Sequence, residues 1–471
     1  MSIQPAKILK QSSHLVPGKL KITEHLFEVP LNHASAAAGT VRLFARSATK
    51  HTVPAAPPST PPPSPPWLLY LQGGPGMECR SPQNYPFTNT FLDRGYQIIF
   101  LDQRGTGLSS PLSASTILQR AGDEPSNQAA YLKLFRADSI VRDCEAVRLA
   151  LTEQQRAEEE EKRAVGKDED WRKWSVLGQS FGGFCCVTYL SFFPKGLREV
   201  FIAGGLPPVE KTQGPDDVYK RLVNRVMKRN KAYYDKFPED VQRVHSIVRY
   251  LQEGNIVTPS GGRLTARRFL ENGLILGFHG CIEALHELVL KVALEIEEGV
   301  LTRKTLSSLD SAGPFDNNPI YAFLHEPIYC QGIAPKWSAK RIIQEHSEFS
   351  INEDLMEDAP IYFTGEMVFP EDFDDYDELS KIRGVAMQLA EDSDWPDLYN
   401  VEQLNQNEVP TYAAVYMDDM YVDFDLSSET ASKIKGIKTL VTNRIYHDGI
   451  RSKEEEVLRN GLFSMRDDVI D

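Results

Sequence analysis

The sequence has few cysteines, no excess of positive charge and no long hydrophobic run. Its six cysteines are scattered over 471 residues and form no Cys-x-x-Cys pair of the kind that indicates a zinc site. Reduced, scattered thiols are typical of a cytoplasmic protein. The N-terminal stretch "MSIQPAKILKQSSHLV" lacks the apolar segment of a secretory signal, and no apolar run approaches the about 20 residues of a membrane-spanning helix. We therefore expect a cytoplasmic protein that does not enter a membrane.

Acidic residues outnumber basic ones, 66 to 52, and the formal net charge is −14. Nucleic-acid binding needs clustered Lys and Arg to neutralise phosphates, and anionic membrane surfaces attract the same residues. We therefore expect neither a nucleic acid nor a membrane as a partner. The hydrophobic content of 41% is ordinary for a globular protein, and the length allows more than one domain.

Short apolar runs bounded by turn residues occur in the first part of the chain. They are "WLLYLQ" at 67–72, "YQIIFLDQ" at 96–103, "KWSVLG" at 173–178 and "REVFIAGG" at 198–205, and such runs are typical of buried parallel strands. Strand-like runs return near the end of the chain, at 411–419 and 437–443. Residues 20–46 instead alternate in character, which predicts antiparallel strands. Strands that alternate with helices predict an α/β fold with a mainly parallel sheet.

The middle of the chain has a different sequence pattern, with long helical segments and acidic stretches. We expect a core domain in two parts, residues 1–206 and 409–471, with a mostly helical cap domain, residues 207–408, inserted between them. The proline tract "PAAPPSTPPPSPP" at 54–66 cannot pair inside a sheet and is predicted to be an exposed loop. Residues 129–151 have helical spacing, and the charge run at 153–170 is predicted to extend this helix into solvent and then to loop.

A serine lies among glycines in "GQSFGG", which fits the pattern G-x-S-x-G with Gly178, Ser180 and Gly182. A strand-like run precedes the motif and a helix-like run follows it. In this context the chain turns sharply at the serine and exposes its hydroxyl, while small neighbours avoid a collision. Ser180 is therefore the predicted nucleophile; the alternative is a tight structural turn.

A serine nucleophile needs a base, and the base needs an acid that orients it. On the α/β-hydrolase topology the order along the chain is Ser, acid, His. Of ten histidines, only His447 follows the last predicted strand, so it is the predicted base. The segment "AVYMDDMYVDFD" follows the preceding strand; Asp419 is the predicted acid, and Asp418 is the main alternative.

Acyl transfer also needs N–H donors aimed at the developing oxyanion. One predicted donor is the backbone N–H of Phe181, directly after the nucleophile. The other is the N–H of Gly74 in "QGGPG", where glycines let the backbone approach a substrate closely. This chemistry needs no metal and no organic cofactor.

Taken together, "QGGPG", "LDQRGTGLSSP", "GQSFGG", "YMDDMYV" and His447 resemble the proline iminopeptidases, or prolyl aminopeptidases, of the α/β-hydrolase superfamily. The segments "FLHEPIYCQG" and "YFTGEM" resemble the longer subfamily of fungi and some bacteria. The resemblance covers almost the whole chain apart from the proline tract and the charge run. One departure is Gln72, where many members have His.

The resemblance implies an α/β-hydrolase core, a large helical cap and a serine exopeptidase that releases an N-terminal proline from peptides with a free N-terminus. It also implies that carboxylates of the cap bind the substrate's ammonium group, which a desolvated cation requires. By position, Glu326 is the first candidate and Glu366 the second. Phe181, Tyr329 and Phe369 are candidates for an apolar lining around the proline ring.

Two alternatives remain open from the residues alone. One is an esterase or another serine hydrolase of the same fold. The other is a binding protein that kept the fold without catalysis. The fold does not decide between them, and the sequence makes no prediction of oligomeric state.

Overall fold

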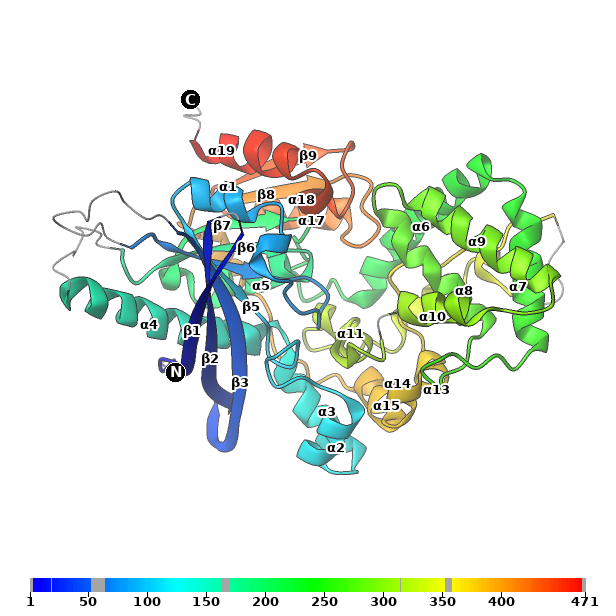
Figure 1. Ribbon diagram of the computed structural model, residues 1–471, viewed down its shortest axis with the longest axis horizontal. Coiled ribbons are helices and arrows are strands. Elements are labelled where there is room, and N and C mark those ends of the chain that lie inside the picture. Colours follow the sequence, from blue (N-terminus) through cyan, green and yellow to red (C-terminus); the bar gives the residue numbers. More distant parts are fainter. Residues whose placement is uncertain are drawn as a thin grey trace.

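The structure is a computed structural model that describes residues 3–17, 19–51, 64–161, 170–313, 315–351 and 358–467. The loops predicted from most of the proline tract and from the end of the charge run lie outside the described residues. A twisted sheet with helices on both faces forms one side of the molecule, and a group of helices forms the other (Figure 1).

In the part of the chain that the structure describes, nine strands form one sheet in the order β1-β2-β3-β5-β4-β6-β7-β8-β9. Neighbouring strands from β1 to β5 in this order pair antiparallel. All neighbouring strands from β5 to β9 pair parallel. The strands are β1 (Lys7–Val16), β2 (Leu20–Asn32), β3 (Ser35–Lys50), β4 (Trp67–Leu71), β5 (Gln97–Leu101), β6 (Trp174–Gln179), β7 (Leu197–Ala203), β8 (Thr411–Tyr416) and β9 (Ile437–Thr442). The predicted mainly parallel α/β sheet is therefore confirmed.

Side chains that alternate along the central strands fill two separate apolar layers. In β4, Leu69 and Leu71 belong to one layer and Leu68 and Tyr70 to the other, because successive strand residues point to opposite faces. The helices of the core are α1 (Thr88–Asp93), α4 (Ala137–Glu161), α5 (Phe181–Phe192), α16 (Val401–Asn405), α17 (Phe424–Lys433), α18 (Gly449–Ser452), the π-helix η7 (Glu455–Leu462) and α19 (Phe463–Asp467). Helices α4 and α5 cover the first face, and α1, η7 and α19 cover the second.

Two elements differ from the sequence prediction. Strand β1 was not predicted, because it is an edge strand whose side chains are almost all exposed and therefore lack apolar alternation. The helix predicted over 129–151 is broken: α3 (Pro125–Leu132) ends before α4 begins. Arg136 adopts an extended conformation between them, with its Nη2 donating to the carbonyl oxygen of Cys330 at 2.6 Å.

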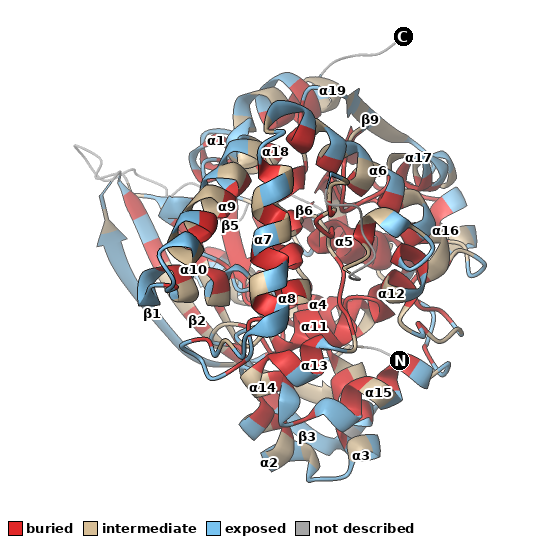
Figure 2. Ribbon diagram, turned by 90° about the vertical axis from the view of Figure 1, so that its right-hand side faces the viewer, coloured by how far each residue is buried: buried red, intermediate tan, exposed pale blue. Residues whose placement is uncertain are grey.

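The segment between β7 and β8 supplies most of the second group of helices, which we call the cap. These are α6 (Pro215–Lys236), α7 (Asp240–Glu253), α8 (Ala266–Leu270), α9 (Cys281–Glu297), α10 (Arg303–Ala312), α11 (Pro319–Leu324), α12 (Ser338–Ile343), α13 (Asp372–Asp375), α14 (Asp377–Ser380) and α15 (Arg383–Glu391). Helix α7 buries one stripe and exposes the opposite face (Figure 2). Helices α2 (Ala114–Ala121) and α3 come from the first half of the chain but share an apolar cluster with α15.

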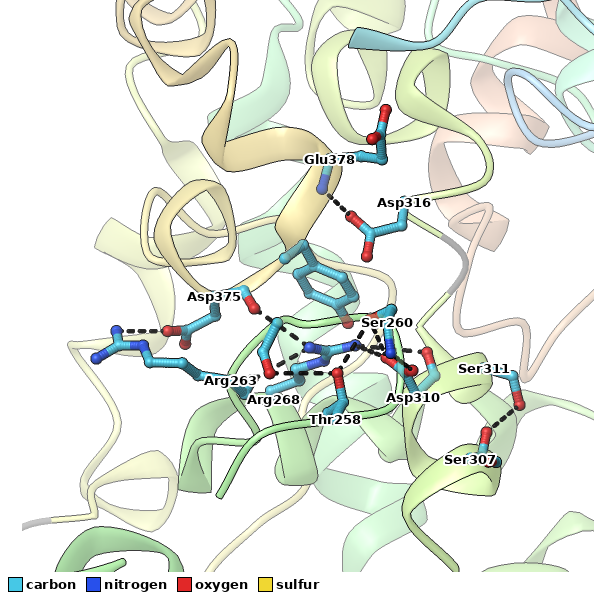
Figure 3. Close-up of polar contacts among 12 residues, drawn as sticks. Thr258, Ser260, Arg263, Arg268, Ser307, Asp310, Ser311, Asp316, Asp375 and Glu378 are labelled. Atoms are coloured by element: carbon cyan, nitrogen blue, oxygen red, sulfur yellow. Dashed lines mark hydrogen bonds and ion pairs between the residues drawn. The ribbon is translucent and has the colours of Figure 1, made fainter. Parts of the chain in front are cut away.

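A buried arginine, Arg268, contacts three parts of the cap (Figure 3). The Arg268 guanidinium, 1% exposed, donates to Asp310 Oδ1 at 2.7 Å and to the carbonyl oxygens of Arg263 and Asp375 at 3.1 and 3.2 Å. It also lies over the ring of Tyr376, 3.7 Å from the centroid. Because these partners lie on or beside α8, α10 and α13, the arginine joins segments that are distant in sequence.

None of the described helices combines the length and the apolar character needed to cross a bilayer. All six cysteines are free thiols.

Candidate active site

Ser180 lies at the sharp turn between β6 and α5. Its backbone has φ 56° and ψ −127°, a left-handed conformation that costs strain in a residue with a side chain. The turn is possible only because its neighbours are small. A Cβ on Gly178 would lie 2.3 Å from the carbonyl oxygen of Gly182, and one on Gly182 would lie 2.0 Å from that of Leu71.

The predicted base and acid lie next to this serine. His447 Nε2 is 2.9 Å from Ser180 Oγ, and His447 Nδ1 is 2.7 Å from Asp419 Oδ2. The other carboxylate oxygen of Asp419 accepts the backbone N–H groups of Tyr421 and Val422 at 2.8 and 3.0 Å. These contacts fix the imidazole so that Nδ1–H donates to the carboxylate and Nε2 accepts the serine proton.

The two neighbouring aspartates of the "YMDDMYV" segment have different environments. Asp419 is 1% exposed and contacts the imidazole, whereas Asp418 points to the surface and forms ion pairs with Lys228 and Arg225 at 2.7 and 3.7 Å. The structure therefore brings Asp419, and not its neighbour, to His447.

Burial by itself lowers the pKa of His447, but the charge and the hydrogen bond of Asp419, together with the charge of Glu366, raise that pKa above its usual value. The buried imidazole can therefore accept a proton readily from a nearby hydroxyl.

A pocket of about 630 Å³ opens above Ser180 and is lined by both the core and the cap. The core contributes the glycine loop after β4, the turn at Ser180 and the loop with His447. The cap contributes Leu274, Phe278, Ile320 and Tyr321, among others. A pocket of this size accommodates a small peptide end rather than a folded protein chain.

Two carboxylates are predicted to bind the substrate's ammonium group, and of these Glu366 lines this pocket. Tyr321 OH donates to its Oε1 at 2.6 Å, and His325 Nε2 lies 3.2 Å from its Oε2. Burial alone would raise the pKa of Glu366, but the contact with His325 and the Tyr321 hydroxyl lower it below the usual value. The carboxylate is therefore held ionised in the wall of the pocket.

Glu326 lies elsewhere in the cap and does not line the pocket at Ser180. Its Oε1 accepts the N–H of Ala339 at 2.9 Å in the first turn of α12, a favourable place for a carboxylate. Burial raises the pKa of Glu326 to about 7. Its neighbour His325 contacts Glu366, so the "FLHEPIYCQG" segment reaches the pocket through the histidine.

The predicted oxyanion donors flank the serine on two sides. The N–H of Phe181 is in the first turn of α5, where helix amides have no intrahelical acceptor. Gly74 lines the pocket, and its neighbour Gly73 lies so close that an added Cβ would be 2.8 Å from Ser180 Cβ. Gln103 Nε2 donates to the carbonyl oxygen of Gln72 at 2.9 Å, so the "LDQRGTG" motif anchors the glycine loop.

The residues proposed as an apolar lining are buried, but Phe181, Tyr329 and Phe369 are not among the side chains that line the pocket. Apolar cap residues line it instead, including Phe278. Its ring stacks on Tyr421 at 5.0 Å between centroids, and Tyr421 lies 4.5 Å from the ring of His447. The sequence gives no signal for the contact between Phe278 and Tyr421, because it joins the cap to the core and the two residues are distant in the chain.

Two polar contacts also hold the cap to the loop that carries the base. His279 Nδ1 lies 2.6 Å from Asp448 Oδ1, and the guanidinium of Arg229 lies over the ring of Tyr446 at 4.7 Å. Tyr446 and Asp448 are the two neighbours of His447 in the chain. The cap therefore helps to fix the position of the imidazole.

Within the described ranges, no group of three or more His, Cys, Asp or Glu side chains is arranged to hold a metal ion. The donor set around Ser180 is that of a hydroxyl, an imidazole and a carboxylate in line. This arrangement can abstract the serine proton as the oxygen attacks a carbonyl carbon.

Comparisons with known proteins agree with the resemblance found in the motifs. The chain is 45% identical over 471 residues to proline iminopeptidase aneH of Aspergillus aculeatus, covering 100% of this chain and 99% of that protein. It is 36% identical over 451 residues to a proline iminopeptidase of Aeromonas sobria, covering 94% and 96%. No family model matches the chain.

A solved structure of a proline iminopeptidase from Mycobacterium smegmatis is 15% identical and covers 97% of this chain and 98% of its own, with a TM-score of 0.36. The two sequence relatives extend over nearly their whole length and nearly the whole of this chain. The chain therefore belongs to the proline iminopeptidase family, as its motifs predict.

Proposed function

We propose that the protein releases proline from the N-terminus of peptides by a Ser-His-Asp mechanism. His447 accepts the proton of Ser180 as the serine oxygen attacks the first peptide carbonyl. Asp419 orients the imidazole and stabilises its protonated form. The proton then passes to the leaving amine, and water releases the acyl group in a second round of the same chemistry.

The single observation that carries this proposal is the unbroken line of contacts from Ser180 Oγ through the imidazole to Asp419, at 2.9 and 2.7 Å, beside a pocket. The N–H groups of Phe181 and Gly74 are the proposed oxyanion donors. Both are backbone groups, so the change from His to Gln72 leaves them intact.

The proposed site for the substrate's ammonium group is Glu366. Its ionised carboxylate lines the same pocket, and its charge acts on His447. A carboxylate in this wall favours a substrate with a free amine over a neutral acyl ester, which supports an aminopeptidase over a simple esterase. Glu326 is not proposed for this role, because its carboxylate is engaged with α12 away from the pocket.

The experiment that tests the function measures proline released from prolyl peptides by the wild-type chain and by the Ser180→Ala variant. Loss of the nucleophile should lower kcat by about 10⁶-fold while the variant stays folded. A serine-directed fluorophosphonate should label the wild type and not the variant. Full turnover by Ser180→Ala would exclude the mechanism, and release of other N-terminal residues without release of proline would exclude the substrate.

A further inference from the structure

Two arginines line the catalytic pocket, and in the described part of the chain neither forms an ion pair. Arg451 is on α18, four residues after His447, and Arg80 follows the glycine loop. Arg451 Nη2 donates to Gln179 Oε1 at 3.1 Å, but its Nε–H is buried without an acceptor. The Asp-His-Ser chemistry uses neither guanidinium.

An arginine with a buried, unpaired N–H beside a catalytic serine is costly unless a ligand pairs with it. A guanidinium presents N–H donors in a planar fork that matches a carboxylate. The two arginines also act on a common neighbour: burial raises the pKa of Tyr70, and the charges of Arg451 and Arg80 both oppose that rise. Both guanidinium groups are therefore close enough to Tyr70 to affect it, although Glu78 also lines this side of the pocket.

The acidic charge of Glu366 comes from the cap, whereas Arg451 belongs to the core. Both act on the imidazole of His447, since the carboxylate raises its pKa and the guanidinium lowers it. The core side of the pocket also carries the carboxylate of Glu78, but of the lining charges it is Glu366 and Arg451 that act on the same reacting group.

Peptide geometry relates these two charges to a substrate. In a dipeptide the terminal carboxylate carbon follows the attacked carbonyl carbon by only three bonds, and it therefore lies about 4 Å or less from it. A cation that pairs with this carboxylate must be close to the nucleophile. Arg451 meets that condition, because it lines the same pocket as Ser180 and is hydrogen-bonded to the side chain of Gln179, the residue directly before the serine.

We propose that Arg451, with Arg80 beside it, binds the terminal carboxylate of a dipeptide whose N-terminal ammonium group is held by Glu366. Dipeptides with a free carboxylate are then the preferred substrates. This inference rests on the proposed function and adds the identity of the leaving group: a free amino acid rather than a long peptide.

The test compares kcat/KM for three substrates: prolyl-alanine, prolyl-alanine amide and prolyl-aspartyl amide. The wild type should prefer prolyl-alanine over its amide by about 10- to 100-fold, the range that one charge-assisted hydrogen bond supplies. Arg451→Gln should reduce that ratio to about 1, Arg451→Lys should retain part of it, and Arg80→Gln should lower it less. Arg444→Gln, which removes an exposed charge from the same terminal loop, is the matched control and should keep the wild-type ratio.

Each outcome decides the question. Equal rates on prolyl-alanine and its amide would overturn the carboxylate site while leaving the proposed function intact. No release of proline from any of the three would overturn the proposed function and this inference with it. A preference for prolyl-aspartyl amide over prolyl-alanine would show that an acidic side chain, and not a dipeptide terminus, is recognised. The wild-type ratio needs no variant, so a misfolded Arg451 variant does not prevent the decision.

Discussion

Replacement of Glu366 by Gln should separate recognition of the substrate's amine from the chemistry of the triad. The side chain is only 14% exposed and keeps its shape in this variant, so the hydroxyl of Tyr321 retains an acceptor. What the variant loses is a negative charge in the wall of the pocket. We therefore expect a defect that depends on the charge of the substrate.

The magnitude follows from the pairing that is lost. A hydrogen bond between charged groups contributes about 1.5–3 kcal/mol, and each 1.4 kcal/mol is a factor of about ten. For a prolyl anilide with a free amine, kcat/KM should fall by about 10- to 150-fold. For p-nitrophenyl acetate, which has no amine, the fall should be much smaller, so the ratio of the two values is the measurement.

A second readout comes from the pH profile. The charge of Glu366 helps to raise the pKa of His447, and the triad needs the neutral imidazole. Activity is therefore lost as the pH falls through this raised pKa, and Glu366→Gln should move the acidic limb of kcat/KM to lower pH. Glu298→Gln, an exposed change in the cap, should leave both readouts unchanged. Equal losses on both substrates with an unshifted profile would refute the assignment.

Further expectations concern the base, the cap and the turn at the nucleophile. In the wild type, the acidic limb should have its midpoint above the usual histidine value of 6.5, and a midpoint below it would contradict the electrostatics described for His447. His279→Ala and Asp448→Asn should each lower kcat more than they raise KM. A double-mutant cycle should then give a coupling of about 0.5–3 kcal/mol, whereas additive effects would dissociate the cap contact from catalysis. Gly182→Ala would bring its Cβ to 2.0 Å from a backbone oxygen, so soluble, fully active protein would disprove the tight packing of the turn. Arg268→Met removes a buried guanidinium from Asp310, which keeps its hydrogen bonds from Ser260, and should cost about 1.5–3 kcal/mol in urea unfolding; a wild-type midpoint would show that the contact is dispensable.

Local patterns in the sequence were sufficient for much of the core. The runs around β4, β5, β6 and β8 are apolar because these strands are buried on both faces, and that property is visible without a structure, whereas β9 is a partly exposed edge strand. The turn at Ser180 was equally readable, since only small residues fit beside it. The exposed edge strand β1 gave no such signal, and neither did the break between α3 and α4.

The sequence likewise predicts some residues of the candidate site and not others. Ser180 and His447 followed from motif and chain order, but the choice between Glu326 and Glu366 did not. The two glutamates lie in similar loop segments, and the one ranked second by position is the one that lines the pocket. The sequence does not predict that Arg451 lines the pocket, because nothing in the segment "HDGIRS" distinguishes a pocket arginine from a surface arginine.

The sequence by itself determined the proposed chemistry: a candidate nucleophile in a sharp turn, a candidate base after the last strand and a candidate acid before that strand. These features depend on residues close together in the chain or on the order of strands, and both are written in local patterns. Only the tertiary structure decided which charges surround the substrate. Glu366 comes from the cap and Arg451 from the core, and their shared pocket exists only after the two parts have packed against each other.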